Sequence, residues 1–431
     1  SLHDALPIFY NNYVEILRTE LIPALGCTEP IALAYASAKA VEVLGDFPES
    51  IKALCSGNII KNVKGVKVPN SGGLKGVESA VILGALGGDA GRKLEVLETV
   101  SETDRIKTKE LLKSHFCTCL LKEGVPNLFI EIQALKGTDR SVVRIENSHT
   151  CITLIERNGE VIYQGDADPV KAQVDKSLLN LKDIIAFAKE VDLGEVREVL
   201  ERQIAYNTAI SDEGLEHEWG AGIGRMILEE FGDDVKWRSI SRAAAGSDAR
   251  MSGCSLPVII ISGSGNQGMT CSLPVIEYAK GTGKSQEQLL RALCISNLVA
   301  QDQKRYIGPL SAYCGAVCAA AGAGAGITYL CGGTQEQIEN TVINTIVNVG
   351  GITCDGAKPS CAAKISSSLQ AAFLGHKMAM KGIRFEAGEG LAMETAEDTV
   401  KAIGYMGREG MRQTDVEILN LMIGKTDLSC I

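Results

Sequence analysis

The stretch Gly351-Ile-Thr-Cys-Asp-Gly-Ala-Lys-Pro-Ser-Cys361 decides how the rest of the chain is organised. Two cysteines, Cys354 and Cys361, flank six residues of which four favour turns. Asp-Gly tolerates a left-handed bend, and the proline keeps the residue before it out of the helical region. The loop can therefore curl so that both thiols point at one small object. The alternative is that both are small buried side chains, as free cysteines usually are, since their spacing matches no general cluster motif.

Length and composition exclude several classes of protein. A chain of 431 residues can form two or three domains with a large core, and its net charge of -10 gives no reason to expect a nucleic acid or an anionic membrane as partner. The chain is 45% hydrophobic but only 5% aromatic, which favours closely packed helices. No apolar stretch is long enough to span a bilayer, and no signal-peptide pattern is visible. We therefore expect a cytoplasmic protein whose 14 cysteines stay reduced, with a subset free to bind metal.

Periodicity predicts a predominantly helical α+β fold in three parts. These are an N-terminal helical part (1–89), an inserted α+β module (90–170) and a helical domain (171–431). Helical patterns cover 11–22, 31–44 and 94–123. Alternating patterns at 128–134, 141–147 and 151–157, followed by the turn Asn158-Gly159, predict a small antiparallel sheet.

A second cysteine, Cys27, lies in Gly-Cys-Thr-Glu-Pro, just before the apolar helix expected at 31–44. Thr28 is a suitable N-cap and Pro30 suits the first turn. The helix dipole and free N–H groups would then favour a thiolate at Cys27. The irregular segment 55–73, rich in Gly, Asn and Lys, can either hold a carboxylate or form a solvated loop.

Other patterns are less specific. Gly263-Ser-Gly-Asn-Gln-Gly268 fits a dinucleotide-binding turn, but Pro274 opposes the helix that such a turn requires, so a turn approaching a small anion or a sulfide is preferred. The polar segment 246–252 can contact a substrate or be an ordinary loop. Cys314 precedes a Gly/Ala-rich run that would form a helix of little bulk, and Cys318 is a competing ligand one turn later.

Four motifs taken together resemble the L-cysteine desulfidase family, which is related to the α-domain of iron–sulfur L-serine dehydratases. They are Leu25-Gly-Cys-Thr-Glu-Pro30, Gly263-Ser-Gly-Asn-Gln-Gly268, Ser311-Ala-Tyr-Cys-Gly315 and the 351–361 stretch. The resemblance implies a [4Fe–4S] cluster held by Cys314, Cys354 and Cys361, with one iron open. It also implies α,β-elimination of L-cysteine to pyruvate, ammonia and sulfide, with Cys27 as the base.

An open iron is a Lewis acid, whereas electron-transfer clusters close every iron with four thiolates. Loop residues would orient the small amino-acid substrate; they are Ser56, Asn58, Asn70, Ser71, Gly72, Asn266 and Gln267. Two other functions remain open at this point: elimination from L-serine, or a non-catalytic iron–sulfur sensor. The sequence predicts no nucleic-acid or membrane partner and leaves both a monomer and a homo-oligomer open.

Overall fold

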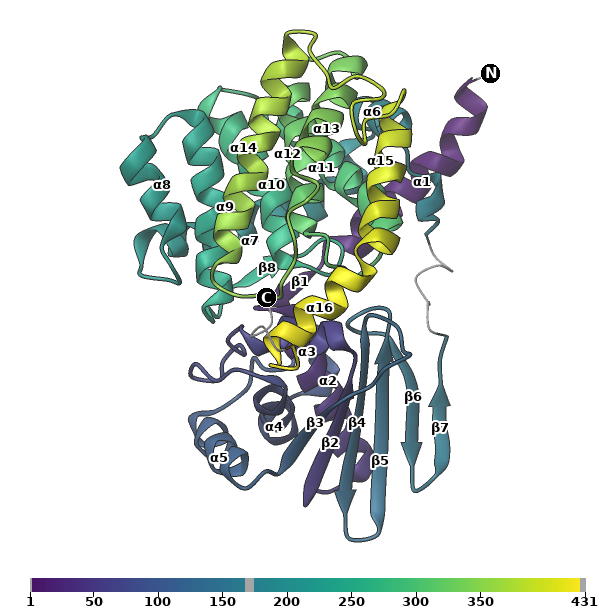
Figure 1. The fold of residues 1–431 in the computed structure, drawn as a ribbon, viewed down its shortest axis with the longest axis vertical. Helices are drawn as coiled ribbons and strands as arrows, with labels where there is room; N and C mark the ends of the chain where they lie inside the picture. Colours follow the sequence, from purple (N-terminus) through teal and green to yellow (C-terminus); the bar gives the residue numbers. More distant parts are fainter. Residues whose placement is uncertain (1, 167–173, 427–431) are drawn as a thin grey trace.

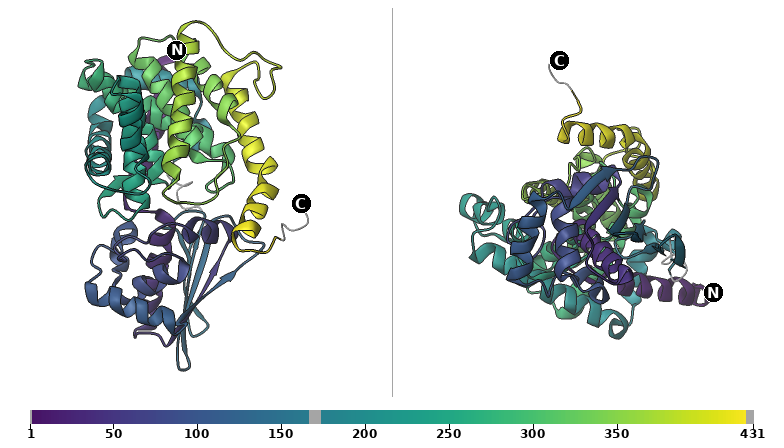
Figure 2. Two further views of the ribbon diagram at one scale, coloured as in Figure 1. Left: turned by 60° about the vertical axis from the view of Figure 1, so that its left-hand side comes forward. Right: turned by 90° about the horizontal axis from the view of Figure 1, so that it is seen from below.

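The structure, a computed structural model, describes residues 2–166 and 174–426 and has two lobes (Figure 1). A helical lobe lies at one end of the long axis, and a lobe built on a β-sheet lies at the other. Two further views in Figure 2 show the same division. The predominantly helical α+β class is therefore confirmed, while the domain boundary expected at residue 170 lies outside the described residues.

The sheet of the smaller lobe is mixed, with strand order β3-β2-β4-β5-β6-β7. β2 pairs in parallel with β3 and antiparallel with β4, and the remaining neighbours are antiparallel, as expected. The β6–β7 turn at Asn158 and Gly159 has positive φ at both residues, as that dipeptide predicts. The strands are β2 (Ser50–Cys55), β3 (Cys117–Leu121), β4 (Phe129–Lys136), β5 (Asp139–Glu146), β6 (Ile152–Arg157) and β7 (Glu160–Gln164).

Helices cover the sheet of the smaller lobe, where α2 packs on β4 and β5 and α4 packs on β3. The helix expected at 94–123 is wrong in its last part, because Cys117–Leu121 alternates between buried and exposed side chains and joins the sheet. The segment 55–73 contains a helix that we did not expect. The helical elements of this lobe are α2 (Thr28–Leu44), α3 (Gly57–Lys64), α4 (Val77–Gly87), η1 (Ala90–Glu95) and α5 (Glu102–Lys113).

The helical lobe is arranged around α12, whose Gly/Ala sequence lets four neighbouring helices approach closely. A side chain at Gly322 would lie 2.3 Å from the Ser296 carbonyl oxygen of α11, so only glycine fits there. The helices of this lobe are α1 (Leu2–Glu20), η3 (Lys176–Leu178), α6 (Leu181–Glu190), α7 (Leu193–Glu216), α8 (Ile223–Phe231), α9 (Val235–Met251), α10 (Gly265–Gly281), α11 (Gln286–Ile307), α12 (Gly315–Leu330), α13 (Gln335–Val349), α14 (Cys361–Met380), α15 (Ala396–Tyr405) and η4 (Met406–Gly410).

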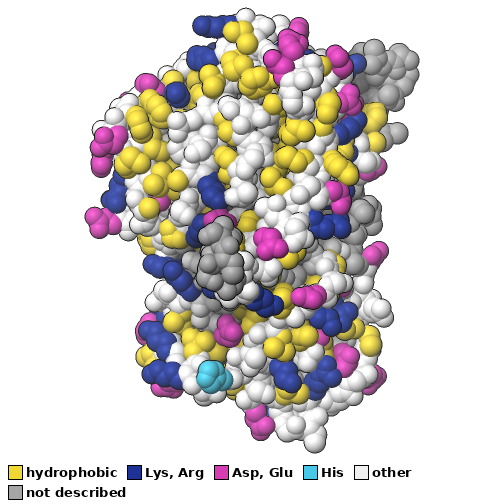
Figure 3. Space-filling model, viewed as in Figure 1, with side chains coloured by type: hydrophobic (Ala, Val, Ile, Leu, Met, Phe, Trp, Pro, Cys, Tyr) yellow, Lys and Arg dark blue, Asp and Glu magenta, His cyan; other side chains and the backbone are white. Residues whose placement is uncertain are grey.

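Two connections tie the lobes together. The short strands β1 (Pro23–Leu25) and β8 (Pro257–Ile259) pair antiparallel and bring the start of α2 beside the start of α10. The last helix, α16 (Arg412–Met422), leaves the helical lobe and packs on α3 of the smaller lobe (Figure 1). On the face drawn in Figure 3, basic and acidic side chains gather along the waist between the lobes. Among the described residues, no helix combines the length and apolarity needed to cross a bilayer.

Candidate active site

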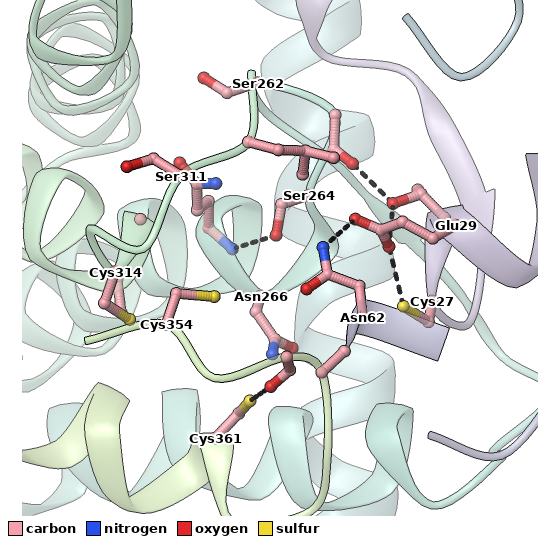
Figure 4. A pocket seen from close by; sticks show the side chains of 18 of the residues that line it. Cys27, Glu29, Asn62, Ser262, Ser264, Asn266, Ser311, Cys314, Cys354 and Cys361 are labelled. Carbon is pink, nitrogen blue, oxygen red and sulfur yellow. Dashed lines mark hydrogen bonds between the residues drawn. The ribbon is translucent and has the colours of Figure 1, made fainter. Parts of the chain in front are cut away.

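Four helices begin at the wall of one cavity of about 110 Å³ between the lobes (Figure 4). Cys27 caps α2, Ser264 caps α10, Cys314 caps α12, and Cys361 is the first residue of α14. Each helix N-terminus carries a partial positive charge of about one half and presents unpaired N–H groups. The convergence therefore favours negative charge inside the cavity.

The thiols of Cys314, Cys354 and Cys361 all line this cavity. Two loops hold the first two: the Cys314 amide donates to the Ile352 carbonyl at 3.1 Å, and the Cys354 amide donates to the Ala312 carbonyl at 2.6 Å. Gly356 lies between the second and third cysteines with φ +94°, and a side chain there would meet the Lys61 carbonyl oxygen of α3 at 2.4 Å. The loop thus curls as its Asp-Gly pair predicts and rests against the smaller lobe.

The trio is well suited to an iron–sulfur cluster by its donor chemistry. Burial, together with the neighbouring Cys354, raises the pKa of Cys314 to about 12, and burial also raises the pKa of Cys361. Thiolates are soft donors of the kind that bind iron–sulfur clusters, as well as copper(I) and zinc. Within the described ranges no three His, Cys, Asp or Glu side chains are close enough to share one metal ion. Cys318 is fully buried in α12 and is not part of the cavity wall.

Across the cavity Cys27 is bonded to a carboxylate. Its Sγ donates to Glu29 Oε2 at 2.9 Å, and the residue is only 2% exposed. The expected thiolate is wrong for the free protein, because burial and the neighbouring Glu29 raise the pKa of Cys27 well above its ordinary value. Thr28 is the first residue of α2 rather than its cap, and its hydroxyl donates to the Gly263 carbonyl at 2.7 Å.

Glu29 is held ionised by residues of the smaller lobe. Asn62 Nδ2 of α3 donates to Glu29 Oε1 at 3.2 Å, and His149 Nε2, from the β5–β6 connection, lies 3.6 Å from the same oxygen. Burial alone would raise the pKa of Glu29, but His149 and the Cys27 thiol lower it to about 2. A buried, ionised carboxylate thus stands beside a buried thiol.

Several polar atoms of the cavity wall have no hydrogen-bond partner within the part of the chain that is described. They are Asn62 Oδ1, Arg250 Nε, Ser262 Oγ, Gln267 Oε1 and Tyr313 OH. Buried polar groups in native proteins are paired in roughly 90% or more of cases. A concentration of unpaired donors and acceptors on one wall therefore indicates a polar ligand.

Of the seven residues proposed to orient a substrate, the structure brings two to this cavity, Asn266 and Gln267. Both lie in the first turn of α10, which continues through Pro274 although we expected the proline to prevent a helix there. Gly315 makes room for the Gln267 amide, since a side chain at this glycine would lie 2.5 Å from it.

The other five residues lie elsewhere. Ser56 caps α3, and Asn58 donates to Asp415 of α16 at 2.6 Å. Asn70, Ser71 and Gly72 line a separate cavity of about 560 Å³. Sequence reasoning also missed residues that line this cavity, including Glu29, His149 and Lys304, whereas Asn62 and Arg250 lie in the segments 55–73 and 246–252 that we considered as possible contacts. The signal for Glu29 was present, because it lies within the Gly-Cys-Thr-Glu-Pro motif, whereas the others are single polar residues in ordinary helical or loop patterns.

Comparisons with known proteins identify the family to which the chain belongs. The sequence matches the family model of the serine dehydratase alpha chain over residues 91–420. It is 52% identical to a UPF0597 protein of Lachnoclostridium phytofermentans, over 96% of this chain and 100% of the relative. UPF0597 proteins of Finegoldia magna (48% identical, 96% of this chain and 100% of the relative) and Treponema denticola (44% identical, 96% and 98%) are similar over the same extent. The chain belongs to the serine dehydratase alpha chain family.

Proposed function

We propose that this serine-dehydratase-like lyase eliminates sulfide from L-cysteine, giving pyruvate and ammonia, with a [4Fe–4S] cluster held by Cys314, Cys354 and Cys361. The observation that carries the proposal is the cavity itself, in which three thiols face a fourth, Cys27, that is bonded to an ionised carboxylate. When bound, a cluster held by only three thiolates supplies an open iron, which acts as a Lewis acid on the departing group.

The Cys27–Glu29 pair supplies the base. Glu29 accepts the S–H hydrogen bond of Cys27 at 2.9 Å and so fixes the sulfur at the cavity wall, where Cys27 acts as the base in its thiolate form. Four helix N-termini and the guanidinium of Arg250 favour that negative charge. The thiolate can then take the α-hydrogen of an amino acid in the cavity. A positioned base of this kind contributes about two to four orders of magnitude in rate.

Water is the only further reactant that the elimination and the hydrolysis after it require. The electron pair of the Cα–H bond forms the Cα=Cβ double bond, and the Cβ–S bond breaks with its electrons on sulfur. The resulting 2-aminoacrylate tautomerises to an imine, which water hydrolyses to pyruvate and ammonia. The proton taken by the base is available to the leaving sulfide.

L-Serine is the second candidate substrate, and the description of the matching family favours it. The same residues would act on it, with hydroxide in place of thiolate as the leaving group. Because a thiolate is the better leaving group, sulfide release demands less assistance from the open iron.

The test is anaerobic reconstitution with iron and sulfide, followed by assays of pyruvate, ammonia and sulfide from L-cysteine and L-serine. We expect broad visible absorption, and faster pyruvate release from L-cysteine than from L-serine. Faster pyruvate release from L-serine would make L-serine the substrate and leave the proposed elimination reaction unchanged. Visible absorption with no turnover of either amino acid would favour the sensor function instead.

Single-cysteine variants separate the proposed role of Cys27 as base from that of Cys354 as a cluster ligand. Cys27→Ala should keep the visible absorption and lose turnover, whereas Cys354→Ala should lose both. Cys294→Ala is the matched control, because Cys294 is equally buried but lies in α11, away from the cavity wall. A Cys27→Ala variant with normal turnover would remove this thiol from the mechanism.

A further inference from the structure

The guanidinium of Arg250, in the last turn of α9, is buried and forms no direct ion pair with any of the described residues. The residue is 2% exposed and lines the catalytic cavity. Within the part of the chain that is described, its one side-chain hydrogen bond runs from Nη1 to Asn266 Oδ1 at 3.2 Å. Nε has no partner at all among these residues. Leaving a charged group buried and unpaired is strongly unfavourable, so a residue of this kind calls for a negatively charged partner from outside the chain.

The backbone around the guanidinium is shaped to admit it. Gly265, at the start of α10, faces Arg250, and a side chain at this glycine would lie 2.4 Å from Nε and 2.7 Å from Cζ. The C-terminal end of α9 also favours a cation, because the helix dipole is negative there. The surroundings therefore hold the guanidinium of Arg250 in one place, unlike the side chain of a surface arginine.

The other cations of the cavity have different surroundings. Lys364 is paired with Asp355 and donates to the Thr353 carbonyl at 2.6 Å. Lys304 interacts chiefly with Cys318, Cys354 and Cys314, on the side of the thiol trio.

Arg250 instead interacts with Cys27, Glu29 and Cys361, so it lies between the proposed base and one end of the trio. In an α-amino acid the carboxylate is attached to the carbon that loses its hydrogen. A group that binds this carboxylate must therefore lie near the base, and among the three cations Arg250 meets that requirement.

We propose that Arg250 binds the α-carboxylate of the substrate and thereby restricts the enzyme to α-amino acids, a role that rests on the proposed elimination. Guanidinium and carboxylate match each other in a two-point hydrogen bond, which also fixes the plane of the carboxylate relative to Cys27. Nε is the unpaired donor available for one of the two bonds.

Two substrate fragments test this role on the reconstituted enzyme. 3-Mercaptopropionate keeps the carboxylate and thiol of cysteine without the amine, and cysteamine keeps the amine and thiol without the carboxylate. In Arg250→Met we expect the inhibition constant of 3-mercaptopropionate and the KM of L-cysteine to rise about 30- to 100-fold, the loss typical of hydrogen bonds to charged groups. The inhibition constant of cysteamine should stay within about twofold, because cysteamine has no group that would bind Arg250.

Two further variants test whether the effect of Arg250→Met arises only from a change in structure. Arg242→Met removes another arginine of α9, one that pairs with Asp212 and Glu277, and it should leave both inhibition constants unchanged. Gly265→Ala keeps the arginine but displaces its guanidinium, and it should weaken 3-mercaptopropionate selectively, as Arg250→Met does. If Arg250→Met fails to fold, the Gly265→Ala variant tests the carboxylate-binding role of Arg250 in its place.

The outcomes separate this inference from the proposed reaction. An equal loss for both fragments, or no loss for either, overturns the role of Arg250 while leaving the elimination intact. If the wild-type enzyme turns over neither amino acid, the elimination fails. The carboxylate role is then judged from the shift in melting temperature that each fragment produces in the wild type and in Arg250→Met. A wild type that 3-mercaptopropionate does not stabilise would overturn it.

Discussion

The buried ion pair between Lys61 and Asp415 should contribute strongly to the stability of the two-lobed structure. Lys61 is 1% exposed on α3, and its ammonium pairs with Asp415 of α16 and donates to the Cys354 carbonyl at 3.2 Å. One side chain thus joins the smaller lobe, the last helix and the loop of the thiol trio. Breaking a buried pair by removing one partner costs about 3–5 kcal/mol, because the other charge is left without compensation.

The size of the effect should depend on which partner is removed. Asp415→Ala leaves a buried ammonium and frees the Asn58 amide, so we expect a loss of about 3–5 kcal/mol. Lys61→Met leaves a carboxylate that is 13% exposed and still bonded to Asn58, so about 1–2 kcal/mol is expected. The double variant Lys61→Met with Asp415→Leu should be more stable than Asp415→Ala alone.

Urea unfolding followed by circular dichroism gives these free energies, and the decay of visible absorption in a chelator reports how firmly the reconstituted cluster is held. Lys61→Met should lose the absorption faster than the wild type because the Cys354 carbonyl loses its hydrogen bond, and Asp415→Ala should do so because the Lys61 ammonium loses the carboxylate that positions it. Lys64→Met is the control: this exposed lysine of α3 donates to the Met422 carbonyl, and its removal should change stability by less than about 0.5 kcal/mol. An Asp415→Ala loss below about 1 kcal/mol, or one smaller than that of Lys61→Met, would refute the reasoning.

Three further predictions concern single residues. Glu29→Gln should keep the visible absorption of the reconstituted protein and lower turnover about 100-fold or more, because a neutral amide holds the Cys27 S–H group more weakly than the carboxylate does; unchanged turnover would contradict this. Gly315→Ala places a carbon 2.5 Å from the Gln267 amide, so the KM of L-cysteine should rise while Gly332→Ala, at an open turn, leaves it unchanged. Burial lowers the pKa of His376 from 6.5 to about 4. The unfolded chain therefore takes up this proton first as the pH falls, so the stabilisation is complete above about pH 6.5 and decreases by up to about 3 kcal/mol toward pH 4. A urea series across this range should show that difference between wild type and His376→Asn, and parallel pH profiles would count against it.

Much of the fold follows from local pattern. The alternating strands after residue 128, the Asn158–Gly159 turn and the tightly packed Gly/Ala helix were all readable from short segments. Where prediction failed, burial in the folded protein outweighed local preference. Pro274 lies inside α10 because the surrounding residues are buried, and the segment 246–252 lies largely in α9 although it is rich in polar residues.

The candidate site was predictable only as far as its motifs extend. The three thiols and Cys27 could be named from the sequence, and they line one cavity. His149 could not, because it is 120 residues from Glu29 along the chain and reaches it only through the packing of α2 against the sheet of the smaller lobe. The protonation of Cys27 could not be predicted either, because burial depends on the whole fold and here outweighs the helix dipole.

The meeting of four helix starts has a consequence for the life cycle of the protein. In the free protein the four helix starts bring roughly two elementary positive charges to one small cavity, and the ionised Glu29 balances only part of them. Anything that binds only the folded chain stabilises it by mass action. The proposed cluster would therefore stabilise the folded chain, and the polypeptide without iron would be the less stable form and the one that proteases degrade faster.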